Sequence, residues 1–174
     1  GAGVIIHPSG IIVTNTHTIM NANRIAVALQ DQTAFPVKVI RVVNGMDIAL
    51  LKIESPQPLP YVPIANSDAL KLGEEILTIG SSALMRQTIS GGKIIGLGVS
   101  RNLEAAGIRR TDLIQTTVNL YQGDSGGPLF NQKGELIGMM TAKEMDADHS
   151  SFAVPSNRIT EALRDYLKEF PEND

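Results

Sequence analysis

The sequence contains no cysteine, and this absence excludes several classes of protein. A chain without thiols forms no disulfide framework, uses no thiolate nucleophile and holds no zinc through cysteine. Its 15 Lys and Arg against 18 Asp and Glu give a formal net charge of −3, which disfavours a general nucleic-acid binder because such proteins present a basic face. No apolar run approaches the ~18 residues that a membrane-spanning helix requires. Residues 1–10 have neither the basic start nor the long apolar stretch of a signal peptide, so we expect none within them.

A length of 174 residues suits one domain, or two small lobes that share a core. Glycine and proline are scattered along the chain and separate short runs rich in β-branched side chains, which is the pattern of strands. The runs are Val4–Ile6, Ile11–Thr14, Ile25–Leu29, Val37–Val43, Ile48–Ile53, Ile76–Ile79, Lys93–Val99, Leu113–Val118, Leu136–Thr141 and Phe152–Val154. Many short strands separated by turns indicate an all-β antiparallel barrel or sandwich.

One clear α-helix is predicted, at the C-terminus. Five apolar side chains recur there at a spacing that places them on one helix face, namely Ile159, Leu163, Tyr166, Leu167 and Phe170. Ser156 or Asn157 is the predicted N-cap, and Pro171 ends the helix. We expect this helix to pack on the β structure, and we expect a shorter helical turn after His17.

The stretch QGDSGGPL, residues 122–129, carries the most chemical information. A serine flanked by glycines suits a nucleophile, because its hydroxyl must project from a tight turn in which backbone N–H groups face inward with no Cβ in the way. The N–H groups of Gly123 and Ser125, on either side of Asp124, are the predicted oxyanion hole, which stabilises the charge that develops during acyl transfer. The sequence therefore predicts Ser125 as a nucleophile.

Serine is a weak nucleophile at neutral pH and needs a base that is itself oriented. His17 follows the predicted strand Ile11–Thr14, and Asp47 begins the apolar segment Asp47–Ile53. Either residue alone is more typical of a surface histidine or of a turn aspartate. Together with Ser125 they give the order His, Asp, Ser of chymotrypsin-type enzymes, so we predict a catalytic triad of His17, Asp47 and Ser125.

Residues 123–127 also satisfy G-x-S-x-G, the nucleophile elbow of α/β-hydrolases. That fold needs a helix after the serine and a histidine downstream, whereas Pro128 follows almost at once and the only downstream histidine is His149. The aspartates just before His149 are too close in sequence to serve as a separately placed orienting group. An esterase is therefore disfavoured.

Residues 144–149 lack the spacing of a zinc or EF-hand site, and we predict a solvated loop there and no metal.

Three segments resemble the catalytic blocks of trypsin-like serine proteases, and most closely those of the HtrA (Deg) branch: TNTHTI (14–19), DIALLKI (47–53) and GDSGGPL (123–129). Further parts of that branch are similar to GAGVIIHPSGIIVTNTHTI (1–19), LIQT (113–116), GELIG (134–138) and FAVPSN (152–157), so the resemblance covers nearly the whole chain. It implies a chymotrypsin-like fold of two six-stranded antiparallel β-barrel lobes with the triad in the cleft between them. The first lobe would span about residues 1–65, the second about 66–155, and the C-terminal helix about 156–170.

The resemblance also implies a role for each residue of these motifs. Ser125 would attack the scissile carbonyl, His17 would take its proton and return it to the leaving amine, and Asp47 would hold the imidazole. Gly123, Asp124 and Ser125 would form the oxyanion loop. The substrate-binding residues would be Leu120, Tyr121, Gln122, Thr141, Ala142 and Lys143. No metal and no organic cofactor is implied.

Some positions depart from the pattern of the branch. Gln122 replaces a proline whose rigid φ would help to aim the oxyanion N–H groups, which predicts a loop that also adopts an inactive form. Leu120 favours a small or medium aliphatic P1 side chain, yet Lys143 and Glu144 stand where apolar pocket walls are expected. The pocket stays apolar if their charged ends reach solvent, and it takes an acidic P1 side chain if Lys143 points inward. The first alternative is favoured.

The predicted function is therefore that of an HtrA-like serine endopeptidase that hydrolyses unfolded or misfolded polypeptides in protein quality control. The alternative is a catalytically silent or switchable protease-fold domain that binds peptides as a scaffold. Members of the branch carry a strand-forming segment before the block at residue 1 and a PDZ module after the last helix, and the sequence contains neither. Since that leading segment supplies trimer contacts, a homotrimer stays open, as does a peptide activator. From the bacterial members of the branch we expect the periplasm or cell envelope.

Overall fold

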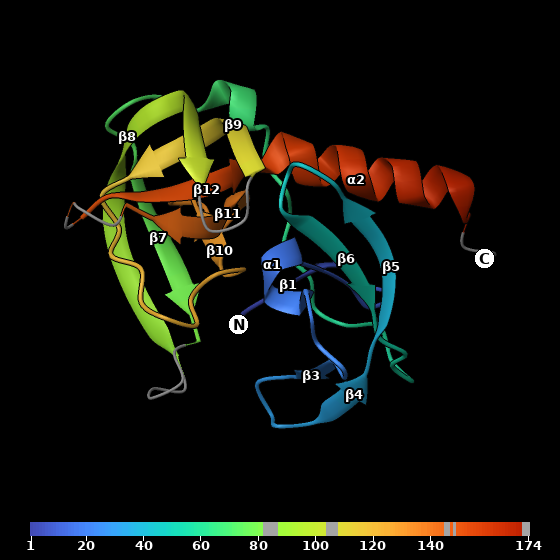
Figure 1. Cartoon of the computed structure of the whole chain (residues 1–174). Coiled ribbons are helices and arrows are strands. Elements are labelled where there is room, and N and C mark those ends of the chain that lie inside the picture. The colour runs from blue at the N-terminus through green and yellow to red at the C-terminus, as the bar shows by residue number, and fades with distance from the viewer. Residues whose placement is uncertain (82–86, 104–107, 145–146, 148, 172–174) are drawn as a thin grey trace.

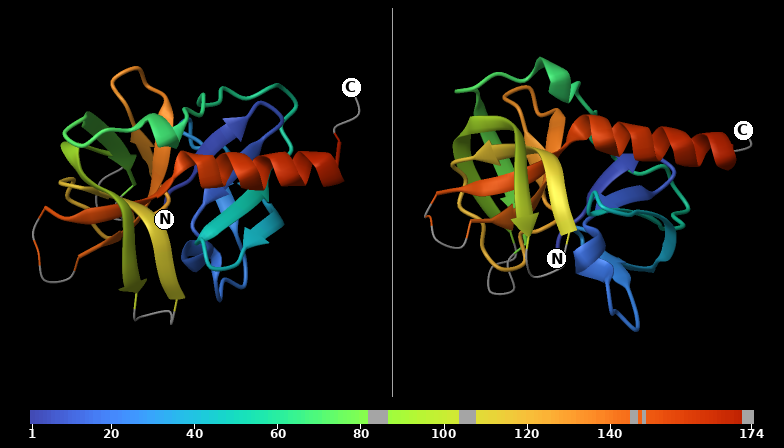
Figure 2. Two further views of the ribbon diagram at one scale, coloured as in Figure 1. Left: turned by 90° about the horizontal axis from the view of Figure 1, so that it is seen from above. Right: turned by 45° about the horizontal axis from the view of Figure 1, so that its top comes forward.

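The computed structural model describes residues 1–81, 87–103, 108–144, 147 and 149–171. Two groups of strands lie side by side, and the C-terminal helix runs across both of them (Figures 1 and 2). We keep the names first lobe for residues 1–65 and second lobe for residues 66–155. The all-β class with a C-terminal helix is confirmed. Among the described residues, no helix combines the length and the apolar character that crossing a bilayer would require.

The first lobe contains six strands, which hydrogen bonds join into two sheets. A four-stranded antiparallel sheet has the order β1 (Val4–His7), β2 (Ile11–Thr14), β6 (Ile48–Lys52) and β5 (Lys38–Val43), and a separate ribbon pairs β3 (Ala26–Ala28) with β4 (Ala34–Pro36). Ile12, Leu51 and Ile53 are buried in an apolar cluster to which side chains of the ribbon, such as Val27 and Phe35, contribute. The first lobe is therefore a sheet and a ribbon joined by side-chain packing, and its hydrogen-bonded ladder does not close into the expected barrel.

The second lobe is a closed antiparallel barrel, as the resemblance predicts. Its strands follow the order β10 (Pro128–Phe130), β11 (Leu136–Lys143), β12 (Ser151–Pro155), β9 (Ile108–Thr116), β8 (Thr88–Leu103) and β7 (Glu75–Gly80). Apolar side chains fill its interior, including the fully buried Leu129, Ile137 and Met140. Closure leaves no unpaired edge along most of the barrel, so its strands are held on both sides.

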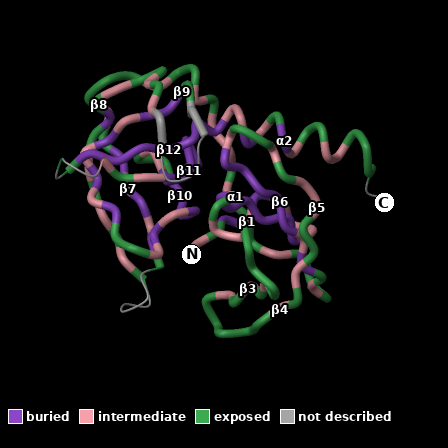
Figure 3. The backbone as a smooth tube through the Cα atoms, viewed as in Figure 1, coloured by how far each residue is buried: buried purple, intermediate pink, exposed green. Residues whose placement is uncertain are grey.

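A third apolar cluster lies between the lobes and beneath the helix α2 (Ser156–Glu169). Ile11 and Leu50 enter it from the first lobe, Phe152 enters it from the second, and Ile159 enters it from α2, each with at most 1% of its surface exposed. Buried segments accordingly concentrate where the two lobes face one another (Figure 3). This shared core fixes the position of one lobe relative to the other.

The start of α2 differs from the sequence prediction. Pro155, and neither Ser156 nor Asn157, is the N-cap, and it has no side-chain group that could cap the helix. The Ser156 hydroxyl instead donates to Ala65 O at 2.7 Å, at the junction between the lobes. Asn157 Oδ1 accepts from the Ser67 N–H at 3.0 Å in the short 3₁₀ turn Ser67–Ala69. Tertiary partners have taken both polar side chains, and a first-turn N–H of the helix is satisfied from a distance instead, since Asn157 N donates to Ser67 Oγ at 3.0 Å.

We predict that Ile159→Ala lowers the free energy of unfolding by about 2–5 kcal/mol, because it leaves a cavity in the cluster shared by both lobes and α2. Urea unfolding followed by circular dichroism measures the loss. The matched control is Asp165→Ala on the exposed face of the same helix, for which we expect a change within about 0.5 kcal/mol. Equal effects of the two substitutions would contradict this account of the interface.

Candidate active site

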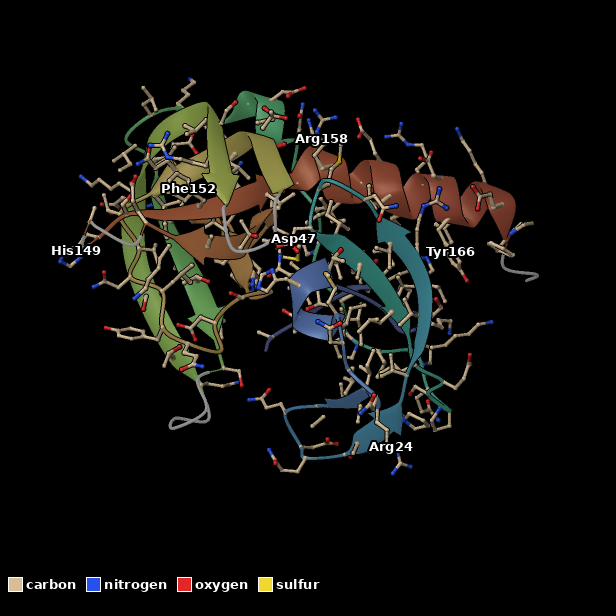
Figure 4. The ribbon with its side chains drawn as sticks, in the orientation of Figure 1. Arg24, Asp47, His149, Phe152, Arg158 and Tyr166 are labelled. Atoms are coloured by element: carbon tan, nitrogen blue, oxygen red, sulfur yellow. The ribbon has the colours of Figure 1, made fainter. Side chains whose placement is uncertain are left out.

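Asp47 lies at the junction of the two lobes, beside the short helix α1 (Thr16–Ile19) (Figure 4). It is the last residue of the turn between β5 and β6, has a φ of 57°, and is only 2% exposed. Its backbone carbonyl accepts hydrogen bonds from Thr16 N at 3.2 Å and from Asn15 Nδ2 at 3.2 Å. The left-handed backbone conformation is uncommon for a residue with a side chain, and here the anchored carbonyl holds it. Asp47 and the start of α1 are thus one fixed unit.

The carboxylate of Asp47 accepts hydrogen bonds from both lobes. On the first lobe, His17 N donates to Oδ1 at 2.9 Å, and His17 Nδ1 lies 2.7 Å from Oδ2. On the second lobe, Thr141 Oγ1 donates to Oδ2 at 2.6 Å. A carboxylate oxygen can only accept a hydrogen bond, so the neutral His17 imidazole carries its proton on Nδ1 and donates it to Asp47. Nε2 is then left as an acceptor. The Asp47 side chain is 1% exposed and that of His17 is 38% exposed, so the acid is buried while the imidazole reaches solvent.

Thr141 connects this pair to Ser125. Its carbonyl oxygen accepts a hydrogen bond from Ser125 Oγ at 3.5 Å, while its hydroxyl binds Asp47. The structure therefore brings the three predicted triad residues into one hydrogen-bonded cluster across the lobe interface. Among the described residues, Ser125 Oγ makes no hydrogen bond to His17, because the hydroxyl is turned towards Thr141 O. Thr141 was predicted only as a substrate-binding residue, and nothing in the sequence indicated its contact with Asp47.

The turn before Ser125 places two backbone N–H groups next to its hydroxyl. Asp124 N donates to Tyr121 O at 3.0 Å, and Gly123 has a φ of 102°. A turn closed by this hydrogen bond, with positive φ at its third residue only, is of type II, in which that residue is typically glycine. Neither Gly123 N nor Ser125 N donates to an acceptor within the described part of the chain. Both N–H groups therefore have hydrogen-bonding capacity left for a ligand.

The N-terminal residues brace the other side of this turn. Ala2 N donates to Ser125 O at 3.0 Å, and Ala2 O accepts from Thr14 Oγ1 at 2.7 Å. Gly126, with a φ of 88°, lies so close to Ala2 that a Cβ there would collide with the Ala2 carbonyl oxygen. Glycine is thus required at this position by both its backbone conformation and the available space. Ser125 is held by the first lobe as well as by its own barrel.

The predicted substrate-binding residues lie around the same turn. Leu120 is 7% exposed and packs in the core of the barrel, whereas Tyr121 is 56% exposed and Gln122 is also on the surface. Along β11, Thr141 is buried, Ala142 is half-buried and Lys143 is exposed. The pairing of β10 with β11 ends at Met139, so no described strand covers the β10 side of Thr141–Lys143. This short open edge lies next to Ser125.

Glu144 makes contacts with Ser150 and Arg101 that the sequence did not predict. Its carboxylate accepts from Ser150 Oγ at 3.0 Å and lies 3.7 Å from Arg101 Nε of β8. Its N–H donates to Ser150 O at 2.9 Å, which closes the base of the loop that follows β11. Residues 145, 146 and 148 of the predicted solvated loop lie outside the described residues. No group of three or more His, Asp or Glu side chains that could hold a metal occurs among the residues described.

The structure also bears on the disfavoured esterase. His149 is exposed at the outer edge of the second lobe, far from Asp47 in the view of Figure 4. Residues 125–127 lead into the strand β10, where an α/β-hydrolase would have a helix. The G-x-S-x-G match therefore comes from the glycines of a turn between strands.

Comparisons with known proteins show which family the chain resembles. A sequence model of the family described as "Trypsin-like peptidase domain" matches residues 1–139. The crystal structure of a serine endoprotease from Yersinia pestis superposes with a TM-score of 0.82 at 31% identity, over 97% of this chain and 58% of that one. A two-lobed β fold with histidine, aspartate and serine clustered at the lobe junction defines a class of peptidase domain. The chain belongs to the trypsin-like peptidase domain family.

The curated relatives narrow this similarity to the HtrA branch. The chain is 37% identical to serine protease HTRA1B of Danio rerio over 94% of its length, and 38% identical to the periplasmic pH-dependent serine endoprotease DegQ of Escherichia coli over 99%. These alignments cover 34% and 38% of the two relatives, so the chain spans little more than a third of their length. The predicted resemblance to trypsin-like proteases of the HtrA (Deg) type is confirmed.

We predict that Thr141→Val lowers the free energy of unfolding by about 1.5–3 kcal/mol, since the buried Asp47 carboxylate loses a donor while the side-chain shape is kept. Urea denaturation measures the change. Thr117→Val is the control, because the Thr117 hydroxyl only accepts from Lys93 N at a less buried site. A loss at Thr141 no larger than that at Thr117 would show that the bridge to Asp47 contributes nothing to stability.

Proposed function

We propose that this chain is a serine endopeptidase that cleaves unfolded or misfolded polypeptides through a His17–Asp47–Ser125 triad and an acyl-enzyme intermediate. The observation that carries the proposal is the hydrogen-bonded cluster across the lobe junction. In it, Asp47 binds His17 Nδ1 at 2.7 Å and Thr141 Oγ1 at 2.6 Å, and Ser125 Oγ binds Thr141 O. The HtrA relatives, which are named serine proteases, support the same chemistry.

In the proposed reaction, His17 acts as the general base. Asp47 keeps the proton on Nδ1, so the Nε2 lone pair accepts the proton of Ser125 as Oγ attacks the scissile carbonyl. The buried carboxylate then stabilises the imidazolium, which returns the proton to the leaving amine. Water hydrolyses the acyl-enzyme by the same steps in reverse, and no metal or organic cofactor takes part. Before attack, rotation about χ1 of Ser125 exchanges Thr141 O for His17 as the partner of Oγ, because catalytic hydrogen bonds often tighten only in the substrate complex.

The backbone N–H groups of Gly123 and Ser125 form the proposed oxyanion hole, on either side of Asp124. Both have unused donor capacity among the described residues, and both belong to the turn that precedes the nucleophile. Donors fixed in advance stabilise the tetrahedral intermediate without reorganisation, and the loss of one such donor typically costs about 10²–10³ in kcat. The rigid turn therefore supplies part of the proposed rate enhancement.

An extended polypeptide is the substrate that this site accommodates best. The open side of Thr141–Lys143 offers backbone groups for pairing with an added strand, next to the Ser125 hydroxyl. A segment must be unfolded to pair there, which favours unfolded or misfolded substrates. The apolar Leu120 and the exposed Lys143 support an aliphatic P1 side chain. Tyr121, Gln122 and Ala142 would also line the proposed pocket.

From the periplasmic relative in Escherichia coli we propose the bacterial cell envelope as the place where this chain acts.

A second candidate, the silent or switchable protease-fold domain, is favoured by one observation. The Ser125 hydroxyl donates to Thr141 O and so is not poised against His17. In this form the domain would bind a peptide along Thr141–Lys143 without cleaving it. Covalent labelling separates the candidates, because only a serine with a working base and oxyanion hole reacts rapidly with a fluorophosphonate.

We predict that the wild-type chain is labelled at Ser125 by a fluorophosphonate and cleaves a denatured protein such as reduced casein. Ser125→Ala should abolish labelling and lower kcat by about 10⁴-fold or more, with an unchanged unfolding curve. Ser81→Ala, an exposed serine of the same lobe, is the control and should keep full activity. If the wild type is not labelled, with or without added peptides, the proposal of an active endopeptidase would be wrong, and the silent peptide-binding domain would be favoured.

We further predict that a P1-scanning peptide library shows preferred cleavage after Val, Ile, Leu or Ala. Leu120 is apolar and buried, while Lys143 is exposed and Glu144 is balanced by Arg101, so no free charge is expected in the pocket. Rates after Asp and Glu should be lower by about tenfold or more, because an ion would be desolvated without a partner. A clear optimum at Asp or Glu would place the Lys143 ammonium inside the pocket.

A further inference from the structure

Asp124 is a buried acid that the proposed reaction does not use directly. It is 2% exposed and lies between Gly123 and Ser125, the two proposed oxyanion donors. Its Oδ2 accepts from Tyr121 N at 2.9 Å, and its own N–H donates to Tyr121 O at 3.0 Å. Asp124 thus donates to Tyr121 through its backbone and accepts from Tyr121 through its side chain, and the two hydrogen bonds together close the turn. Whatever fixes Asp124 therefore also fixes the relative direction of the N–H groups on either side of it.

The second oxygen of this carboxylate is held by Thr88. Thr88 Oγ1 donates to Asp124 Oδ1 at 3.2 Å, from the first residue of β8. No Lys, Arg or His side chain forms an ion pair with Asp124 among the residues that the structure describes. Among the described residues, this buried carboxylate is thus stabilised by one amide and one hydroxyl. Hydrogen bonds to an ionised acceptor are about twice as strong as neutral ones, so losing either is costly.

Gly80 provides the space in which this contact forms. It pairs with Thr88 in the β7–β8 ladder, and a Cβ at Gly80 would collide with Asp124 Oδ1 and come within 2.7 Å of Thr88 Oγ1. The φ of Gly80 is not in the positive range, so the backbone does not demand glycine there. The available space alone requires it. Because Gly80 has no side chain, the Thr88 hydroxyl can reach the Asp124 carboxylate. This hydrogen bond connects the β7–β8 hairpin to the turn before Ser125.

We propose that Thr88 is a positioning residue of the active site: its hydroxyl holds the Asp124 carboxylate against the turn and so keeps the Gly123 and Ser125 N–H groups convergent. Thr88 touches neither the substrate nor the reacting atoms and acts through Asp124. Without the hydroxyl, the Asp124 carboxylate loses a donor that the structure describes, and the turn spends more time in arrangements whose N–H groups diverge. This inference rests on the proposed function, because it assigns these N–H groups the task of stabilising an oxyanion.

The test compares Thr88→Val, which keeps the side-chain shape and removes the hydroxyl, with Thr88→Ser, which keeps the hydroxyl. We expect Thr88→Val to slow fluorophosphonate labelling of Ser125 and to lower kcat by about tenfold, with KM changed less than about twofold. Thr88→Ser should restore both rates to within about twofold of the wild type. Thr88→Ala replaces the valine variant if valine prevents folding.

Ser156→Ala is the matched control, because it also removes a buried hydroxyl hydrogen bond, to Ala65 O at 2.7 Å, but at the lobe junction. It should lower stability and leave the labelling rate unchanged. Equal labelling by Thr88→Val and the wild type would overturn the proposal, as would equal slowing by Thr88→Val and Ser156→Ala.

Amide hydrogen exchange separates failure of this inference from failure of the proposed function. The Tyr121 N–H is bound to Asp124 Oδ2, so its exchange should be about tenfold faster in Thr88→Val than in the wild type or in Ser156→Ala. If the wild type is not labelled at all, the proposed function fails. Unchanged exchange of the Tyr121 N–H in Thr88→Val would then also show that Thr88 does not hold the turn. Faster exchange would show that Thr88 holds the turn, whose N–H groups would then bind a different ligand.

Discussion

The active site depends on one buried carboxylate that both lobes contact. Asp47 comes from the first lobe and orients His17, while Thr141 of the second lobe donates to the same oxygen. A buried charge is costly unless it is fully hydrogen-bonded, so separating the lobes would leave Asp47 without one of its donors. The requirement to satisfy this carboxylate thus helps to hold the proposed base, His17, and the proposed nucleophile, Ser125, at one place. Stability and the proposed chemistry are coupled through the same oxygen.

The remaining architecture can be understood as the support that this contact needs. The lobes share one apolar cluster, and α2 covers it with Ile159 and Ala162, so their relative position is set by close packing. The second lobe closes into a barrel, whereas the first consists of a sheet and a ribbon that meet through side chains. The turn before Ser125 is attached to both lobes. The contact between Asp124 and Thr88 attaches it to the barrel, and Ala2 attaches it to the first lobe. Rigid support on two sides is what a hole made of backbone N–H groups requires.

Patterns that depend on neighbouring residues were predictable from the sequence, and contacts between distant residues were not. Every predicted strand has a counterpart, yet β4 (Ala34–Pro36) and β10 (Pro128–Phe130) were missed, because three residues that include proline give little periodic signal. The motifs around His17, Asp47 and Ser125 indicated the family, and the structure brings these residues together. The Thr141 bridge spans 94 positions and the Thr88 contact spans 36, so no local pattern could reveal them. The N-cap was wrong for the same reason, since Ser156 binds Ala65, which is 91 positions away.

The orientation of the Ser125 hydroxyl matters for the proposed reaction. Thr141 O accepts it at 3.5 Å, a long and therefore weak hydrogen bond, whereas the proposed attack needs the same proton to go to His17 Nε2. A peptide that pairs along Thr141–Lys143 would bring its own carbonyl towards the turn and surround the hydroxyl, which alters the balance between the two acceptors. A weak resting bond makes that exchange inexpensive in free energy. Thr141 thus stabilises Asp47 through its side chain and binds the proposed nucleophile, Ser125, through its backbone carbonyl, and this dual contact makes Thr141 the link between the two halves of the candidate site.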